Sequence, residues 1–421
     1  MSLRKLNLRS LTCAALGGLL LVPALSIAQP AKGANKFLGN ITTGAQGDVR
    51  SDFLTYWNQI TAENGHKWAS VEDKRNTMTW ATGDKVYNFA KQNNILWKFH
   101  TLVWGSQYPS WITSLSQADQ LKEITEWMDA VKAKYPDCPM IDVVNEAQPG
   151  HAPAPFKNAL GGDGSTGFDW IIKSFQMARE RWPKAILIYN DYNNCEYGDQ
   201  VDWTYKLVQA MIKAKAPIDA IGCQAHDAWR LSTSTVKSNI DKLASLGLPI
   251  FITEYDIQQS DDTKQASIMK EQFTMFWNHP KIVGITYWGM ASTWRQGTEL
   301  FKGTSERPAV TWLKDYVAKN PNPPNDFPNF LKGATGVSQT SHVNGITSKV
   351  NVSIIGKKQI VINGLNENAQ MELVALNGAV VFRGTLSGKG NDCVALNNSL
   401  SGMYLVNVKT AAGNISKSVI F

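Results

Sequence analysis

The sequence lacks the cysteine pairs of zinc and redox proteins and the basic runs of nucleic-acid-binding proteins. Its five cysteines include no C-x-x-C pair, which argues against a zinc site or a redox motif. It also has no block of five or six basic residues, although Lys and Arg outnumber Asp and Glu by 42 to 35. Nucleic acid is therefore not an expected partner. We expect neither a metal nor another cofactor.

Long apolar runs are also scarce, and the one near the N-terminus is short for a membrane span. It covers residues 16–27, contains two glycines and a proline, and follows Arg4, Lys5 and Arg9. Small residues then end at Ala28, which completes the pattern of a cleaved signal peptide over residues 1–28. The alternative is an N-terminal membrane anchor. We expect a secreted protein with no transmembrane anchor after cleavage. Export permits disulfides among the remaining cysteines, but the sequence does not reveal their pairing.

An alternation of short β-rich runs and amphipathic helical stretches occupies most of the chain. The eight runs cover residues 36–40, 59–62, 96–103, 140–144, 185–189, 220–223, 249–253 and 282–287. Eight such units in this length predict an α/β fold, a (β/α)8 TIM barrel over residues 29–319. A doubly wound open sheet gives a similar alternation. The first run is not followed by a Gly-rich dinucleotide loop, which disfavours that alternative.

The pattern changes after residue 319. Residues 320–347 begin with Asn-Pro-Asn-Pro-Pro-Asn and are predicted to form a linker. Residues 348–421 contain short alternating runs separated by Gly and Asn, which predicts a small all-β, sandwich-like module. None of the 15 tryptophans lies in this last part.

Polar or aromatic residues follow nearly every predicted strand of the barrel. Carboxyl ends of barrel strands carry the active site in this architecture. The most informative are two carboxylates, Glu146 after the fourth run and Glu254 after the seventh. A pair of carboxylates on one face suits glycosidic cleavage, in which one donates a proton and the other attacks the anomeric carbon. Asn145 could bind a substrate hydroxyl, and His226, oriented by Asp256, could hold Glu254 ionised.

The order of these motifs resembles glycoside hydrolase family 10, the endo-β-1,4-xylanases. The matching stretches are TAENGHKW at 61–68, HTLVW at 100–104, VVNEA at 143–147, NDYN at 190–193, QAH at 224–226 and ITEYD at 252–256. The resemblance covers residues 39–318. It implies that Glu146 is the acid/base and Glu254 the nucleophile of a retaining reaction, with His226 and Asp256 as supports.

The resemblance also implies a set of substrate-binding residues. Glu63, Asn64 and Lys67 resemble the family's ligands for a sugar two places toward the non-reducing end. His100, Trp104, Asn145 and Gln224 resemble those of the cleavage subsite, and Tyr192 resembles a residue that lines the leaving-group side. Gln107, Trp288 and Trp294 complete the expected set.

Three positions depart from the family pattern. Gly105 stands where the family usually has His, and Lys98-Phe99 replaces Arg-Gly before His100. The loop after Trp288 is short and lacks the usual Asp. These changes leave both carboxylates in place. They point to a divergent branch of the family with altered subsite detail.

The C-terminal module resembles the sorting domains of type IX secretion, through GMYLVNV at 402–408 and the final run 416–421. Its expected partner is then a secretion machinery. An ancillary carbohydrate-binding module is the alternative. For the barrel, xylan or xylo-oligosaccharides are the expected substrates. The two rival functions are a retaining endo-glycanase for another β-glycan and a polysaccharide-binding barrel without activity.

Overall fold

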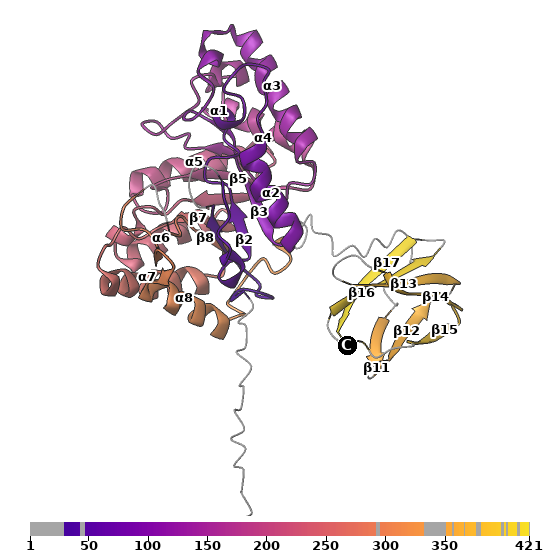
Figure 1. The fold of residues 1–421 in the computed structure, drawn as a ribbon. Coiled ribbons are helices and arrows are strands. Elements are labelled where there is room, and N and C mark those ends of the chain that lie inside the picture. Colours follow the sequence, from indigo (N-terminus) through magenta and orange to yellow (C-terminus); the bar gives the residue numbers. More distant parts are fainter. Residues whose placement is uncertain are drawn as a thin grey trace, which may run out of the picture.

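The computed structural model describes a barrel part and a C-terminal β part (Figure 1). In the first it describes residues 29–42, 47–291 and 295–331. In the second it describes residues 351–355, 358–365, 367–375, 380–396, 400, 403–410 and 413–420. The predicted signal peptide over 1–28 and the expected Trp294 lie outside the described residues.

Eight parallel strands form a closed barrel, which confirms the predicted (β/α)8 fold and excludes an open sheet. The strands are β1 (Phe37–Ile41), β2 (Gln59–Thr61), β3 (Leu96–Trp104), β4 (Met140–Asn145), β5 (Ile186–Asp191), β6 (Ala220–Cys223), β7 (Ile250–Tyr255) and β8 (Ile282–Tyr287). Closure comes from β1 pairing with β8, where Phe37 lies opposite Gly284. All eight carboxyl ends therefore open on one face of the barrel.

Helices follow the strands and cover the outside of the barrel. They are α1 (Trp68–Val71), α2 (Ala81–Asn93), α3 (Gln117–Lys134), α4 (Asp169–Arg181), α5 (Gly198–Lys213), α6 (Thr233–Ala244), α7 (Asp262–Asn278) and α8 (Pro308–Lys319). Short 3-10 turns lie between them: η1 (Phe53–Thr55), η2 (Ser110–Ser114), η3 (Lys157–Leu160) and η4 (Ala228–Arg230). A small hairpin, β9 (Phe301–Lys302) and β10 (Ser305–Glu306), precedes α8.

Three helices begin at residues whose side chains cap the first turn. Ser116, Ser232 and Asp261 each accept a hydrogen bond from the backbone N–H three residues later. This satisfies a donor that the helix itself leaves unpaired. The caps explain why α3, α6 and α7 begin where they do.

A second apolar cluster closes the barrel at the amino ends of the strands. Its buried members are Phe37, Met140, Ile186, Ile188, Ala220, Phe251 and Val283. Residue 284 must be glycine here, because a Cβ would lie 2.2 Å from the Phe37 ring. Phe327, Phe330 and Leu331 pack against this cluster from the chain segment beyond α8.

The first part of the predicted linker is thus attached to the barrel. The Asn35 amide donates to the Pro323 carbonyl at 2.8 Å, and the Asn325 amide donates to the Asn35 carbonyl at 2.6 Å. The Asp326 N–H donates to the Pro280 carbonyl at 2.8 Å. Proline and asparagine signal an irregular backbone, but they do not show whether that backbone is packed. The rest of the predicted linker, 332–347, lies outside the described residues.

The C-terminal part has two antiparallel sheets, with strand orders β11-β12-β15 and β14-β13-β16-β17. The strands are β11 (Asn351–Ile355), β12 (Gln359–Leu365), β13 (Ala369–Ala375), β14 (Val380–Leu386), β15 (Gly390–Ala395), β16 (Met403–Thr410) and β17 (Gly413–Ile420). Ile360 and Ile362 of one sheet share a buried cluster with Leu373 and Val406 of the other. The predicted sandwich-like character is confirmed.

Two further observations concern the described part of the chain. None of its helices combines the length and the apolar character needed to cross a membrane. Its four cysteines are all free thiols: Cys138, Cys195 and Cys223 are buried and Cys393 is exposed.

We predict that residues 320–331 stabilise the barrel. A chain that ends at Leu331 should keep the cluster intact, whereas one that ends at Lys319 loses Phe327, Phe330 and Leu331. Removing large side chains from a packed cluster costs roughly 2–5 kcal/mol per buried residue. Since these three are only partly buried, we expect a loss of about 3 kcal/mol in total. Urea unfolding of the two truncated chains measures the difference, and equal stabilities would contradict the prediction.

Candidate active site

A cleft of about 630 Å³ lies over the carboxyl ends of the barrel strands. Its lining includes the expected Glu63, Asn64, Lys67, His100, Trp104, Gln107, Glu146, Tyr192, Gln224, His226, Glu254 and Trp288. Asn145 and Asp256 are buried and contact two lining residues, Gln224 and His226, from behind. Every expected site residue that the structure describes is thus in or against one cleft.

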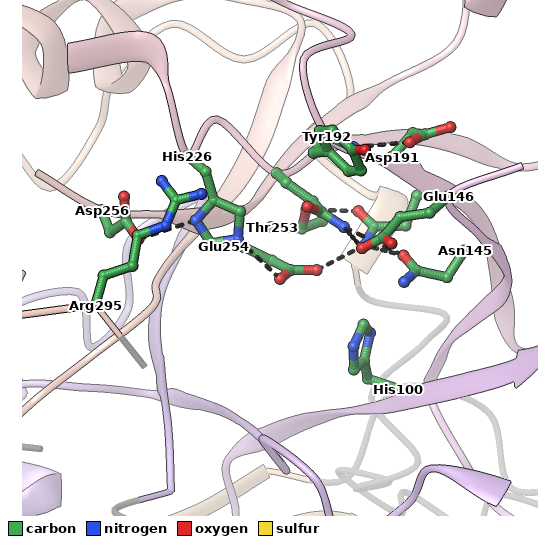
Figure 2. Close-up of polar contacts among 12 residues, drawn as sticks. His100, Asn145, Glu146, Asp191, Tyr192, His226, Thr253, Glu254, Asp256 and Arg295 are labelled. Atoms are coloured by element: carbon green, nitrogen blue, oxygen red, sulfur yellow. Dashed lines mark hydrogen bonds and ion pairs between the residues drawn. The ribbon is translucent and has the colours of Figure 1, made fainter. Parts of the chain in front are cut away.

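Glu254, in β7, is held by two nitrogen donors (Figure 2). The Asn190 amide donates to its Oε1 at 2.8 Å, and His226 Nε2 lies 3.3 Å from its Oε2. The other ring nitrogen, Nδ1, lies 3.0 Å from Asp256 Oδ2. His226 thus bridges two carboxylates, as the sequence predicted.

This arrangement shifts the pKa values of His226 and Glu254 in opposite directions. Burial by itself would lower the pKa of His226, but Asp256 and Glu254 raise it to about 10. Burial would also raise the pKa of Glu254, but chiefly the hydrogen bond from His226 lowers it to about 2. At neutral pH an imidazolium therefore faces an ionised Glu254. Such a carboxylate is ready to attack an electrophilic carbon.

Glu146 follows β4 in a different environment. The Trp104 indole donates to its Oε2 at 2.9 Å, and the Gln224 amide donates to its Oε1 at 2.9 Å. Burial raises its pKa above the ordinary value, and the negative charges of Glu254 and Asp191 add to this. No cationic side chain hydrogen-bonds to Glu146 among the described residues. Glu146 therefore retains its proton to a higher pH than Glu254 does.

Asn145 has one side-chain atom that no described protein group satisfies. Its Oδ1 accepts from the Asn190 amide at 2.8 Å, so the orientation of the amide is set. Its Nδ2 is buried and has no hydrogen-bond partner in the described structure. A buried donor without an acceptor is costly unless a ligand supplies one. A hydroxyl group bound next to the two carboxylates would do so.

Lys67 is the centre of a polar group at the β2 and β3 side of the cleft. Its ammonium donates to Asn64 Oδ1 at 2.9 Å and to Gln107 Oε1 at 2.6 Å, and it lies 5.0 Å from the centre of the Trp104 ring. Burial lowers its pKa, although Glu254, Glu63 and Glu146 act in the opposite direction. These donors and acceptors around an indole ring suit a sugar, which combines apolar faces with hydroxyl edges.

The replacement of Arg-Gly by Lys98-Phe99 is compensated inside the barrel. The Lys98 ammonium lies 2.6 Å from Asp142 Oδ2, and His100 Nδ1 lies 2.9 Å from the same oxygen. Lys98, His100 and Asp142 are all buried. Lys98 therefore still supplies a positive charge behind His100, and the His100 ring remains anchored.

The sequence reasoning missed three residues that line the cleft, namely Asn193, Asp227 and Arg295. Arg295 Nη1 lies 3.5 Å from Asp227 Oδ1, so the loop after β8 reaches the loop after β6. The contact joins residues 68 positions apart, and no local pattern signals it. The sequence reasoning also missed that Asn190 binds Glu254, although Asn190 belongs to the NDYN motif at 190–193.

The chain matches glycosyl hydrolase family 10 over residues 27–320. The chain belongs to this family. Among the residues that the structure describes, no group of three or more His, Cys, Asp or Glu is arranged to hold a metal ion.

Its family 10 relatives include proteins named as xylanases. It is 46% identical over 285 residues to endo-1,4-beta-xylanase B of Cellvibrio japonicus (strain Ueda107), a match that covers 66% of this chain and 45% of that protein. It is 30% identical over 278 residues to endo-1,4-beta-xylanase B of Thermotoga neapolitana, covering 63% of this chain and 78% of that one. The chain thus spans less than half of the first relative and over three quarters of the second.

A solved family structure agrees with the barrel. The crystal structure of xylanase 10B from Thermotoga petrophila RKU-1 in complex with xylobiose superimposes with a TM-score of 0.62 at 26% identity. The alignment covers 70% of this chain and 98% of that one. The expected family fold is therefore confirmed for the barrel part.

The two hydrogen bonds to Glu146 predict how its titration responds to mutation. Both donors favour the ionised carboxylate, so Gln224→Ala or Trp104→Phe should raise the pKa of Glu146 further. NMR titration of labelled glutamate carboxyls measures this directly. Gln120→Ala is the control, since that amide donates to the Ile112 carbonyl beside α3. An unchanged or lower Glu146 pKa in both variants would show that these bonds do not set its charge.

Proposed function

We propose that this protein is an endo-β-1,4-xylanase that hydrolyses internal β-1,4-xylosidic bonds of xylan with retention of configuration. The observation that carries the proposal is the pair Glu146 and Glu254 in one cleft, with pKa values shifted in opposite directions. A retaining glycosidase needs one protonated and one ionised carboxyl group at the same bond. The names of the family relatives support xylan as the substrate.

In the first step, a Glu254 oxygen attacks the anomeric carbon and the bond from that carbon to the leaving oxygen breaks. Glu146 gives its proton to the leaving oxygen, so the departing chain leaves as a neutral alcohol. The product is a glycosyl ester on Glu254 and an ionised Glu146. The loss of the Glu254 charge in the ester lowers the pKa of Glu146, which suits it to act as a base next.

In the second step, water attacks the same anomeric carbon while Glu146 removes one of its protons. The ester bond to Glu254 breaks, and both carboxyl groups return to their starting states. Two inversions restore the β configuration. Asn190 and His226 keep Glu254 in place throughout, since they bond to its two different oxygens.

The binding residues divide the cleft around this bond. We assign Lys67 and its neighbours to the sugars that stay on the enzyme. Asn64, Gln107 and Trp104 contact the Lys67 ammonium on the β2 and β3 side, and Glu63 lines the same cleft and interacts with its charge. Asn145 Nδ2 is assigned to a hydroxyl of the sugar that is cleaved. His100 and Trp288 form the wall beside it, with ring centres 5.5 Å apart.

Variants of the two carboxylates test the mechanism. Glu254→Ala should abolish turnover of every substrate, because no nucleophile remains. Glu146→Ala should lose roughly 10²–10⁴-fold on xylan, the usual contribution of general acid–base catalysis. It should lose much less in the first step on an aryl xylobioside whose leaving group needs no proton. Added azide should then restore turnover and give the β-azide, since azide attacks the ester without a base.

The wild-type reaction provides the control for substrate and stereochemistry. Reducing-sugar assays on xylan, glucan and mannan, side by side, identify the polymer. NMR of the first product on xylan should show the β anomer. Preference for another β-glycan would identify the rival endo-glycanase, and binding without turnover would identify the inactive binder. An α-configured first product would overturn the retaining mechanism.

We also propose that the protein is secreted, with residues 1–28 removed and the module from residue 348 acting as a sorting signal for a secretion machinery. Support comes from the N-terminal pattern and from the resemblance of residues 402–421 to type IX sorting domains. A chain ended at Leu331 should stay fully active when purified but should remain inside its native cell. Normal export of the shortened protein would refute the sorting role, whereas binding of xylan by the isolated module would favour the ancillary one.

A further inference from the structure

A histidine outside the expected site lies directly behind one wall of the cleft. The His151 ring is stacked on the Tyr192 ring, with ring centres 3.5 Å apart and planes inclined by 15°. Its side chain is 7% exposed, whereas Tyr192 is partly exposed and lines the cleft. One face of the tyrosine is therefore covered by the imidazole.

His151 is held in this position at both ring nitrogens. Nδ1 lies 2.7 Å from Asp191 Oδ1, and Nε2 lies 3.0 Å from Gln200 Oε1. These contacts join the loop after β4 to the end of β5 and to α5. A ring anchored at both nitrogens has little freedom to rotate, so it forms a firm support for whatever stacks on it.

Asp191 bonds to both His151 and Tyr192. It is fully buried and accepts hydrogen bonds from the Tyr189 hydroxyl at 2.5 Å and from the Tyr192 N–H at 2.9 Å. It therefore orients both His151 and the Tyr192 backbone. Figure 2 shows Asp191 and Tyr192 on the Glu146 side of the site, away from His226. In the proposed reaction Glu146 protonates the leaving oxygen, so this side receives the leaving chain.

The departure at Gly105 explains how His151 reaches this place. The Gly105 N–H donates to the Ala152 carbonyl at 2.9 Å, and the Ala152 N–H donates to the Glu146 carbonyl at 2.9 Å. A Cβ at position 105 would lie 2.3 Å from the carbonyl oxygens of both Ala152 and Pro153. Any larger residue there would displace the loop that carries His151. The absence of a side chain at 105 and the presence of His151 behind Tyr192 are therefore linked.

We propose that His151 is a positioning residue that holds the Tyr192 ring as the stacking platform for the leaving part of the xylan chain, in space that Gly105 leaves open. The role rests on the proposed xylanase function. A ring that is already ordered loses less side-chain entropy when a sugar stacks on it. The platform contributes to binding of the leaving chain, whereas the Lys67 group lies on the β2 and β3 side of the cleft.

Two substrates separate this role from a general structural one. Xylopentaose places sugars on both sides of the cleaved bond, whereas xylobiosyl fluoride has a leaving group too small to reach Tyr192. His151→Ala should lower kcat/KM on xylopentaose roughly fivefold, mainly through KM, which corresponds to about 1 kcal/mol for an aromatic pair. On the fluoride it should change kcat/KM by less than about twofold. His151→Phe, which keeps a ring behind Tyr192 but cannot bond to Asp191 or Gln200, should recover only part of the loss.

A double-mutant cycle with Tyr192 completes the test. In a Tyr192→Ala background, His151→Ala should cause no further selective loss on xylopentaose, because the platform is already gone. An additive loss, an equal loss on both substrates, or no loss on either would overturn the proposal. Thermal unfolding confirms that each variant is folded at the assay temperature. If the wild-type protein turned over neither substrate, the proposed function itself would be wrong.

Discussion

The pairing of β1 with β8 converts a row of parallel strands into a closed ring. Because every strand in the ring runs the same way, all eight carboxyl ends meet on one face. Asn145 at the end of β4 thereby lies within hydrogen-bond distance of Gln224, directly after β6, although the two residues are 79 positions apart. The cluster of aromatic and aliphatic side chains at the opposite end keeps the ring filled, so the polar groups can gather at one end only.

Within this ring, the neighbours of each carboxylate determine what it does. Glu254 faces a protonated His226 that Asp256 supports from behind, and Asn190 binds its other oxygen. Among the described residues Glu146 accepts hydrogen bonds only from neutral donors, and burial together with the negative charges of Glu254 and Asp191 raises its pKa. Two chemically similar side chains thus differ in charge at the same pH. The asymmetry is produced by fixed groups, so it exists before any substrate binds.

The sequence was most informative where function demands particular residue types at strand ends. The eight strands follow from apolar runs, and Glu146 and Glu254 follow from the position of carboxylates directly after two of them. Contacts between distant loops were not predictable, because Arg295 meets Asp227 and His151 meets Asp191 only after folding. The sequence shows that Gly105 departs from the family pattern. The reason for glycine there is the backbone of the loop at residues 152–153, which leaves no room for a Cβ. The packing of residues 320–331 against the barrel was likewise not predictable, because its partners are distant in the sequence.

The rim of the cleft also contains residues in a backbone conformation that side chains disfavour. Glu146, Gln107 and Asn193, which line the cleft, and the buried Ala225 all have positive φ angles, between 47° and 63°. Each such residue costs of order 1 kcal/mol or more. Ala225 lies between Gln224 and His226, so glycine there would relieve the cost but free the two flanking groups. Selection for thermal stability alone would therefore favour glycine at these positions first. The resulting protein would be more stable but a poorer catalyst.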